Sequence, residues 1–125
     1  ELLRIDDPFT ASRRITTCPV RTGGVEIPAG ARVHLSWADA NRDPDRFDDP
    51  DRFRPEENAA GNLVYGAGPH VCPGRGLATL EIRIAVEELL AGTSGLALDP
   101  ESAPVRALPP HGGFSSVPVR LMPRT

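Results

Sequence analysis

The stretch that decides the fold reads Tyr65-Gly66-Ala67-Gly68-Pro69-His70-Val71-Cys72-Pro73-Gly74. It sets one cysteine among three glycines, residues that adopt positive φ and let the backbone approach a flat ligand closely. After it, apolar residues recur at helical spacing, which predicts a long helix over 74–91 that Gly92 stops. The apolar positions of this helix are Leu77, Leu80, Ile82, Ile84, Val86, Leu89 and Leu90.

Cys72 is therefore predicted to lie at a helix N-terminus, where the dipole and free N–H groups favour a thiolate. A thiolate in a glycine-lined loop is well suited to hold a heme iron. A zinc site is the alternative, but the available side chains show no Cys-x2-Cys or His-x3-His spacing, which disfavours it. These side chains are Cys18, His34, His70, Cys72 and His111. Cys18 is expected to be a free thiol, because two cysteines are too few for a disulfide scaffold.

The stretch resembles the heme-binding signature of cytochrome P450, which reads aromatic-Gly-x-Gly-x-His-x-Cys-x-Gly. Its matching positions are Gly66, Gly68, His70, Cys72 and Gly74. Tyr65 stands where the family usually has phenylalanine, and its added hydroxyl needs a partner if it is buried. Pro73, expected in the first turn of the helix, is a second departure from the family, which often has leucine there. The run 77–81 resembles the start of the helix that follows the cysteine in bacterial members.

The resemblance implies heme b as the cofactor and a role for each matched residue. Cys72 is the implied axial thiolate, and no catalytic residue is identified beyond it. His70 and Arg14 are implied to pair with the heme propionates, although Arg13 competes with Arg14 for this role. Tyr65 is implied to pack near the thiolate. The glycines implied in cofactor binding are Gly66, Gly68 and Gly74, the last through the backbone N–H groups that follow the cysteine.

A second resemblance concerns charged residues far from the cysteine. Glu1 and Arg4 match the family's Glu-x-x-Arg element, and the run 50–53 resembles its Pro-x-Arg-Phe element. The family's arginine there closes a buried triad, which carried over is Glu1, Arg4 and Arg52. Two guanidinium groups on one carboxylate need strong hydrogen bonding to offset desolvation. Exposed charges are the alternative.

The predicted fold class is α+β, in one segment over 1–125 that resembles the C-terminal part of the P450 fold. Strands are predicted over 13–18, 25–27 and 31–36, followed by a short helix over 37–41 that Ser36 caps. Phe47 and Phe53 are expected to anchor an otherwise irregular coil. The expected parts are the end of a helix (1–5), a small antiparallel sheet (13–36), a meander (43–64), the cysteine loop (65–74), the long helix (74–91) and a terminal hairpin region (96–125). Gly113 and Phe114, near the tip of the hairpin, are candidates for the substrate pocket.

Composition excludes several other classes of protein. The chain has 125 residues and a net charge of −3 with acids and bases mixed, which argues against nucleic-acid binding. No apolar run approaches the roughly 18–20 residues of a membrane span. No signal-peptide pattern opens the sequence, so the expected location is cytoplasmic.

The resemblance covers nearly the whole chain but only the C-terminal part of the family. The family's distal helix, with its acid–Thr pair, has no counterpart in the sequence. The implied function is that of a heme-thiolate monooxygenase segment, which inserts one oxygen atom of O2 into a small organic substrate. The alternatives are a truncated relative with peroxidase-like activity and a heme-free auxiliary protein that binds a partner. The expected partners are a ferredoxin or reductase, a missing N-terminal half or a second copy. A half-domain is expected to expose apolar surface where its missing partner would lie.

Overall fold

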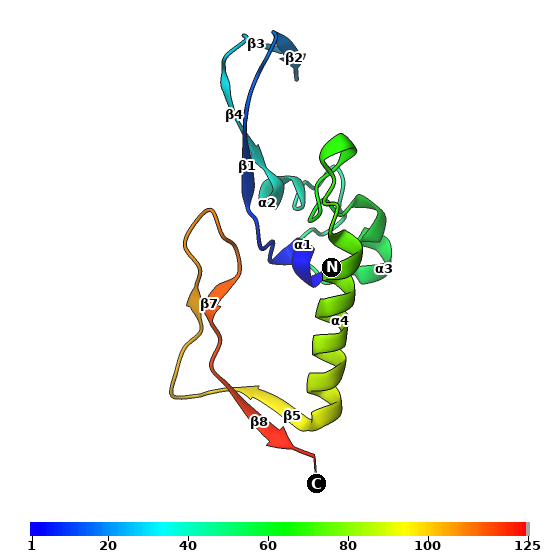
Figure 1. Cartoon of the computed structure of the whole chain (residues 1–125), viewed down its shortest axis with the longest axis vertical. Helices are drawn as coiled ribbons and strands as arrows, with labels where there is room; N and C mark the ends of the chain where they lie inside the picture. The colour runs from blue at the N-terminus through cyan, green and yellow to red at the C-terminus, as the bar shows by residue number, and fades with distance from the viewer. Residues whose placement is uncertain (125) are drawn as a thin grey trace. The chain divides into compact units, whose positions relative to one another are not determined.

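The computed structural model describes residues 1–124, whose helices and strands are drawn in Figure 1. These residues form two compact units. Unit 1 comprises Glu1–Val64 and Pro109–Gly112, and unit 2 comprises Tyr65–Leu108 and the described part of Gly113–Thr125. Thr125, the last residue of the expected hairpin region, lies outside the described residues. A short C-terminal piece, Pro109–Gly112, thus belongs to the N-terminal unit.

Unit 1 opens with the helical turn α1 (Leu2–Ile5) and two separate β-ladders. Strand β1 (Ala11–Ile15) pairs antiparallel with β4 (Arg32–Ser36), and β2 (Val20–Thr22) pairs antiparallel with β3 (Val25–Ile27). Gly23 and Gly24 turn the second ladder with φ of 56° and 79°, a backbone region that favours glycine. The expected small sheet is therefore two ribbons of two strands each, and β2 is a strand that the sequence analysis missed.

The short helix α2 (Trp37–Ala40) begins where the sequence predicted it. The Ser36 hydroxyl accepts a 3.4 Å hydrogen bond from the backbone N–H of Asp39, so Ser36 is the N-cap. The Trp37 indole N–H donates to the Ser12 hydroxyl at 2.9 Å, which fastens α2 to β1.

The expected meander contains two further short helices, α3 (Pro55–Asn58) and the 3₁₀ turn η1 (Ala59–Gly61). Phe47 anchors this segment as predicted, because it is only 2% exposed and packs against Gly61. Phe53 is 53% exposed, so the prediction that it is an anchor is wrong. Among residues 1–124, Phe47 is the only hydrophobic residue in the buried class, while four polar residues are buried. The interior of unit 1 is therefore built mainly on polar contacts.

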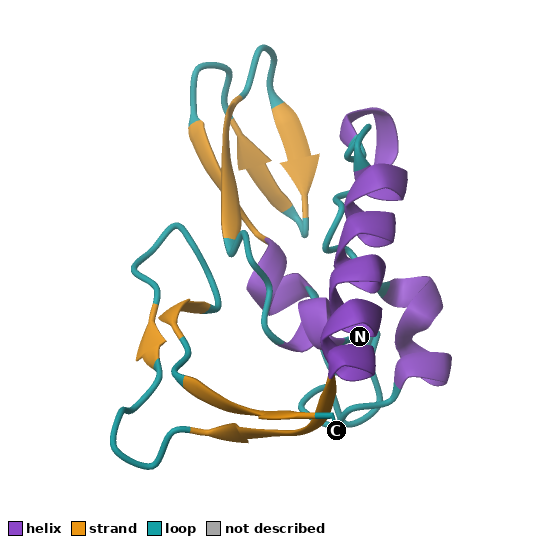
Figure 2. Ribbon diagram, turned by 60° about the horizontal axis from the view of Figure 1, so that its bottom comes forward, coloured by secondary structure: helices purple, strands orange, loops and turns teal. Residues whose placement is uncertain are grey.

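Unit 2 consists of the cysteine loop, the long helix α4 (Arg75–Gly92) and two β-ladders (Figure 2). Strand β5 (Thr93–Leu98) pairs antiparallel with β8 (Val119–Pro123), and β6 (Val105–Arg106) pairs with β7 (Phe114–Ser116). Pro118 lies just before β8, and Pro123 is its last residue. These elements confirm the predicted α+β class.

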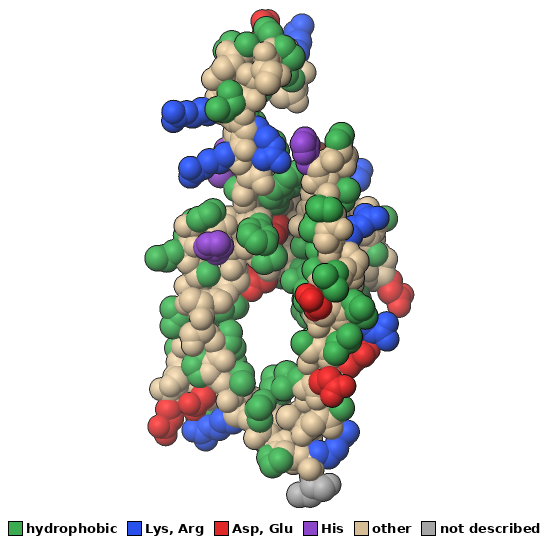
Figure 3. All heavy atoms as spheres, viewed as in Figure 1, with side chains coloured by type: hydrophobic (Ala, Val, Ile, Leu, Met, Phe, Trp, Pro, Cys, Tyr) green, Lys and Arg blue, Asp and Glu red, His purple; other side chains and the backbone are tan. Residues whose placement is uncertain are grey.

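The apolar side chains of α4 are largely exposed: the helix has no buried residue, and Leu77 is 63% exposed. Figure 3 shows apolar side chains along this helix and on the C-terminal strands. The exposed apolar surface expected of a chain that needs a partner is therefore present. No helix in the described part of the chain is long and apolar enough to cross a membrane.

Candidate heme-thiolate site

The cysteine loop is closed by a backbone hydrogen bond between its two ends. The N–H of Cys72 donates to the carbonyl oxygen of Tyr65 at 2.8 Å, and within the loop the N–H of Val71 donates to Gly68 at 3.1 Å. Gly66 and Gly68 have φ of 72° and 65°. Because this conformation strains residues with a side chain, the two matched glycines are what allow the loop to close.

The Cys72 thiol is free and partly buried. It lies just before α4: the N-cap is Gly74, and the Arg75 N–H donates to the Cys72 carbonyl at 3.3 Å. A Cβ on Gly74 would stand 3.9 Å from the Cys72 sulfur, so Gly74 is its close neighbour. Pro73 precedes the N-cap rather than standing in the first turn of the helix, which corrects the sequence-based expectation. The thiol is thus near N–H groups that the helix leaves without intrahelical partners.

Tyr65 is linked to α4 through its hydroxyl group. The Tyr65 hydroxyl lies 2.9 Å from the hydroxyl of Thr79, close enough for a hydrogen bond in which either group donates. The hydroxyl that distinguishes this chain from the usual phenylalanine therefore has a partner.

His70 and Arg14, the two residues predicted to meet the propionates, are both exposed and belong to different units. His70 ends the 3₁₀ turn η2 (Gly68–His70) of the cysteine loop. Arg14 is paired with Val33 in the β1–β4 ladder, whereas Arg13 is paired with His34. Because successive residues of a strand point to opposite faces, the Arg13 and Arg14 side chains leave the strand in opposite directions.

The β1–β4 ladder also borders a surface cleft of about 680 Å³ in unit 1. The residues that line it are Arg13, Arg14, Ile15, Arg32, Val33 and His34. The Arg14 guanidinium donates to the carbonyl of Arg13 at 2.8 Å. The cleft is therefore rich in cationic side chains, as a site for carboxylate groups requires.

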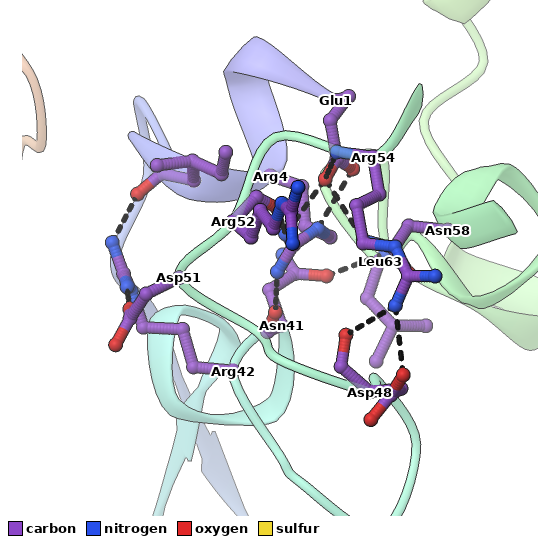
Figure 4. Close-up of polar contacts among 11 residues, drawn as sticks. Glu1, Arg4, Asn41, Arg42, Asp48, Asp51, Arg52, Arg54, Asn58 and Leu63 are labelled. Carbon is purple, nitrogen blue, oxygen red and sulfur yellow. Dashed lines mark hydrogen bonds and ion pairs between the residues drawn. The ribbon is translucent and has the colours of Figure 1, made fainter. Parts of the chain in front are cut away.

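Glu1 and Arg4 form a buried, two-pronged ion pair (Figure 4). The Arg4 Nε and Nη2 atoms donate to the two Glu1 carboxylate oxygens at 2.8 and 2.7 Å, and Arg4 is 0% exposed. Its guanidinium carbon also lies 4.7 Å from the ring centroid of Phe47. The pair expected from Glu-x-x-Arg is thus present, and it packs on the one buried aromatic ring of the described chain.

The structure differs from the expected triad in its third member. Arg52 is exposed, and it offers Arg4 its backbone carbonyl at 3.5 Å rather than its guanidinium to Glu1. Glu1 instead accepts hydrogen bonds from the Arg54 N–H at 3.1 Å and from the Asn58 amide at 2.8 Å. These neutral donors satisfy the carboxylate without a second cation, whose burial would carry its own desolvation cost.

Asn41 is a buried polar residue whose role the sequence analysis did not predict. Its backbone carbonyl accepts a 2.6 Å bond from Arg4, and its side-chain carbonyl accepts a 2.8 Å bond from the Leu63 N–H. Its amide donates to the Asp7 carboxylate at 3.0 Å. The Asn41 side chain therefore joins its own segment to Asp7 and to Leu63.

The pKa values of the two buried carboxylates of this network are shifted in opposite directions. The hydrogen bonds from Arg4, and with them those from Asn58 and Arg54, lower the pKa of Glu1 to about 2. Burial raises the pKa of Asp7, although hydrogen bonds from Phe9 and Asn41 partly offset this effect. Glu1 is therefore held as an anion. For Asp7, the hydrogen bonds offset only part of the cost of burying its negative charge.

The candidate substrate-pocket residues Gly113 and Phe114 lie in unit 2, where the Phe114 ring packs 4.2 Å from the guanidinium carbon of Arg106. The neighbouring segment Pro109–Gly112 belongs instead to unit 1. There the Thr10 N–H donates to Pro110 at 3.3 Å, and the Gly112 N–H donates to Pro8 at 3.0 Å.

The contact between Pro109–Gly112 and the start of unit 1 brings together the rings of Phe9 and His111, whose centroids lie 6.3 Å apart. No sequence pattern linked these two residues, because they are far apart in the chain.

The donor set around Cys72 fits a heme iron better than a zinc ion. The part of the chain that the structure describes contains no group of three or more His, Cys, Asp or Glu side chains able to hold a metal. A structural zinc site needs four protein ligands. A porphyrin supplies four nitrogens of its own and asks the protein for one axial thiolate, which a single free cysteine provides.

Comparison with known proteins gives a consistent result. The cytochrome P450 family model matches residues 1–120. The cytochrome P450 monooxygenase PikC of Streptomyces venezuelae is 47% identical over 100 residues, which are 79% of this chain and 24% of the relative. The erythromycin C-12 hydroxylase of Saccharopolyspora erythraea is 42% identical over 108 residues, which are 85% of this chain and 27% of the relative.

A solved structure, the ligand-free cytochrome P450 TbtJ1, superposes with a TM-score of 0.88 at 36% identity. The match covers 95% of this chain and 32% of the solved one. The chain thus spans about a quarter of the length of these curated relatives and about a third of the solved structure. Since the match to the family runs through the cysteine loop, the long helix and the buried Glu1–Arg4 pair, this chain belongs to the cytochrome P450 family.

Proposed function

We propose that this chain is the heme-binding C-terminal portion of a P450 monooxygenase, with Cys72 as the axial thiolate ligand of heme b. The observation that carries the proposal is the closed cysteine loop, in which the Tyr65 carbonyl holds the backbone of a free thiol beside a helix N-terminus. When bound, heme supplies the activation of O2 from which one oxygen atom enters a small organic substrate.

The residues of this chain have distinct tasks in the proposal. Cys72 holds the iron as a thiolate, and the N–H groups that follow it moderate the charge on the sulfur. His70 and Arg14 pair with the propionates through charge-assisted hydrogen bonds. Gly66 and Gly68 keep the loop free of side chains beside the porphyrin, and Tyr65 limits the access of water to the sulfur.

The second part of the proposal is that this portion acts together with the rest of a P450 fold. The exposed apolar face of α4 supports it, because burying such surface is the main driving force for association. Electrons come in this proposal from a ferredoxin or a reductase, as in bacterial relatives. Gly113 and Phe114 stay candidates for contact with substrate.

Reconstitution of the full chain with hemin, followed by the spectrum of its reduced carbon monoxide adduct, tests the proposal. We expect a thiolate-type spectrum that Cys72→Ala abolishes and that Cys18→Ala, at the other free cysteine, preserves. A spectrum that survives Cys72→Ala would contradict the ligand assignment. If the chain alone takes up no heme, the same pair of variants is compared after coexpression with the N-terminal portion of a bacterial P450, and failure there would overturn the proposal.

A further inference from the structure

Tyr65 makes one hydrogen bond within the cysteine loop, through its backbone, and one to α4, through its side chain. Its backbone carbonyl accepts the 2.8 Å hydrogen bond from Cys72, while its side-chain hydroxyl meets Thr79 at 2.9 Å. Thr79 is the fifth residue of α4, so the hydroxyl contact reaches past the first turn of the helix. The residue that closes the loop is therefore also the one that joins it to the helix.

We propose that Tyr65 and Thr79 form a hydrogen-bonded clamp that positions the backbone of Cys72 against the start of α4. The clamp is a property of this chain, since phenylalanine, the usual residue at the Tyr65 position, has no hydroxyl to bond with Thr79. Tyr65 and Thr79 are positioning residues, because they act on the ligand through the backbone of the loop. Only the consequence for a bound iron rests on the proposed heme function.

The clamp acts because the two contacts of Tyr65 share one residue. When the side chain is held by Thr79, the Tyr65 carbonyl keeps its direction, and the Cys72 N–H keeps its acceptor. When the hydroxyl contact is lost, the residue can turn, and the loop opens more often. The contact is between neutral hydroxyls at an exposed position, so the expected effect is modest, about a two- to tenfold increase in local opening.

Amide hydrogen exchange of Cys72 in the heme-free full chain tests the clamp directly. We expect Tyr65→Phe and Thr79→Val each to speed this exchange about two- to tenfold, while the helical circular dichroism stays unchanged. The double variant should exchange no faster than either single variant, because one contact is removed in all three cases. Thr79→Ser, which keeps a hydroxyl, should restore slow exchange.

Thr93→Val is the matched control, because its hydroxyl donates to the Leu89 carbonyl at 2.8 Å, at the opposite end of α4. It should leave the exchange of Cys72 unchanged. Effects of Tyr65→Phe and Thr79→Val that simply multiply in the double variant, or no effect in either, would overturn the clamp.

The test separates the clamp from the proposed function. Suppose that the double variant exchanges the Cys72 amide no faster than either single variant, but the chain never gives a thiolate-type spectrum. This result would support the clamp and reject the heme role. Multiplying or absent effects in a chain that binds heme through Cys72 would do the reverse. In the loaded protein the clamp further predicts that Tyr65→Phe shifts the reduction potential of the iron, while Thr93→Val does not.

Discussion

The guanidinium of Arg4 donates to the backbone carbonyl of Asn41 at 2.6 Å, and both residues are 0% exposed. Arg4 comes from α1, and Asn41 is the C-cap of α2. The cation thus satisfies a helix-end carbonyl while it holds the Glu1 carboxylate on its other edge. A buried charge with this many partners is costly to disturb from any side.

Asn41→Ala should lower the free energy of unfolding by roughly 2–5 kcal/mol, because it removes the partners of the Asp7 carboxylate and the Leu63 N–H. Urea denaturation gives this value. Asn62→Ala is the control, since its side chain accepts one hydrogen bond, from Val64, at a half-buried position. Equal losses in the two variants would show that Asn41 has no special role.

Stability should fall in acid because of Glu1. Its pKa is about 2 in the folded chain against an ordinary value of 4.5, so its contribution is complete above about pH 4.5 and is lost as the pH falls towards 2. Asp7 has a raised pKa and opposes this trend, since its protonation relieves a buried charge. Glu1→Gln should flatten the decline of stability with falling pH, and Asp7→Asn should steepen it, in urea titrations across this range. An unchanged profile in Glu1→Gln would mean that other carboxyl groups govern acid unfolding.

The sequence predicted the features that depend on local pattern. The glycines of the cysteine loop, the period of α4 and the Ser36 cap each follow from neighbours in the chain, and the structure has all three elements. The third member of the expected triad could not be predicted from local pattern. Whether Arg52 offers its guanidinium or its carbonyl depends on how the backbone packs around Arg4, and residue type does not encode that choice.

Buried polar residues were the other class that sequence reasoning missed. Asn41 and Asn58 are buried although asparagine is mostly exposed in proteins, and neither lies in a periodic apolar pattern. Phe53 shows the reverse error. It was expected to anchor the meander because it is aromatic, but Phe47 occupies the interior, with Arg4 on its ring and Gly61 against its edge.

Phe47→Ala and Phe53→Ala should therefore differ sharply. Removing the buried ring should cost about 3–5 kcal/mol of unfolding free energy, while the exposed ring should cost less than about 1 kcal/mol. Thermal or urea unfolding of both variants measures this difference, and because both substitutions are Phe→Ala, only the position of the ring differs. A larger loss of unfolding free energy in Phe53→Ala than in Phe47→Ala would show that Phe53, and not Phe47, anchors the meander.

Gly112→Ala should disrupt the contact between Pro109–Gly112 and the start of unit 1. A Cβ at this position would overlap the carbonyl oxygen of Asp7, so the backbone must move, at a cost of about 1–3 kcal/mol or more. Gly76→Ala is the control, because a Cβ there meets nothing within 4 Å and alanine favours a helix by about 0.5–1 kcal/mol. Unfolding free energies should therefore move in opposite directions, and a neutral Gly112→Ala would argue against the contact.

The exposed leucines of α4 should govern self-association rather than folding. Leu77→Gln and Leu90→Gln replace side chains that are 63% and 58% exposed, so each should change the unfolding free energy by less than about 0.5 kcal/mol. The same variants should sediment as smaller species, since they interrupt an apolar surface. A large loss of helical circular dichroism would instead mean that these leucines already pack within this chain.

The hydroxyl of Thr10 bonds to the carbonyl of Pro110 across 100 positions of sequence, at 3.0 Å. On a ribosome, residues 1–64 of unit 1 would be made well before Pro109–Gly112, the four residues that complete the unit. The beginning of the chain therefore lacks this partner until residues 109–112 have been made. Completion of unit 1 is therefore set by translation of the segment Pro109–Gly112.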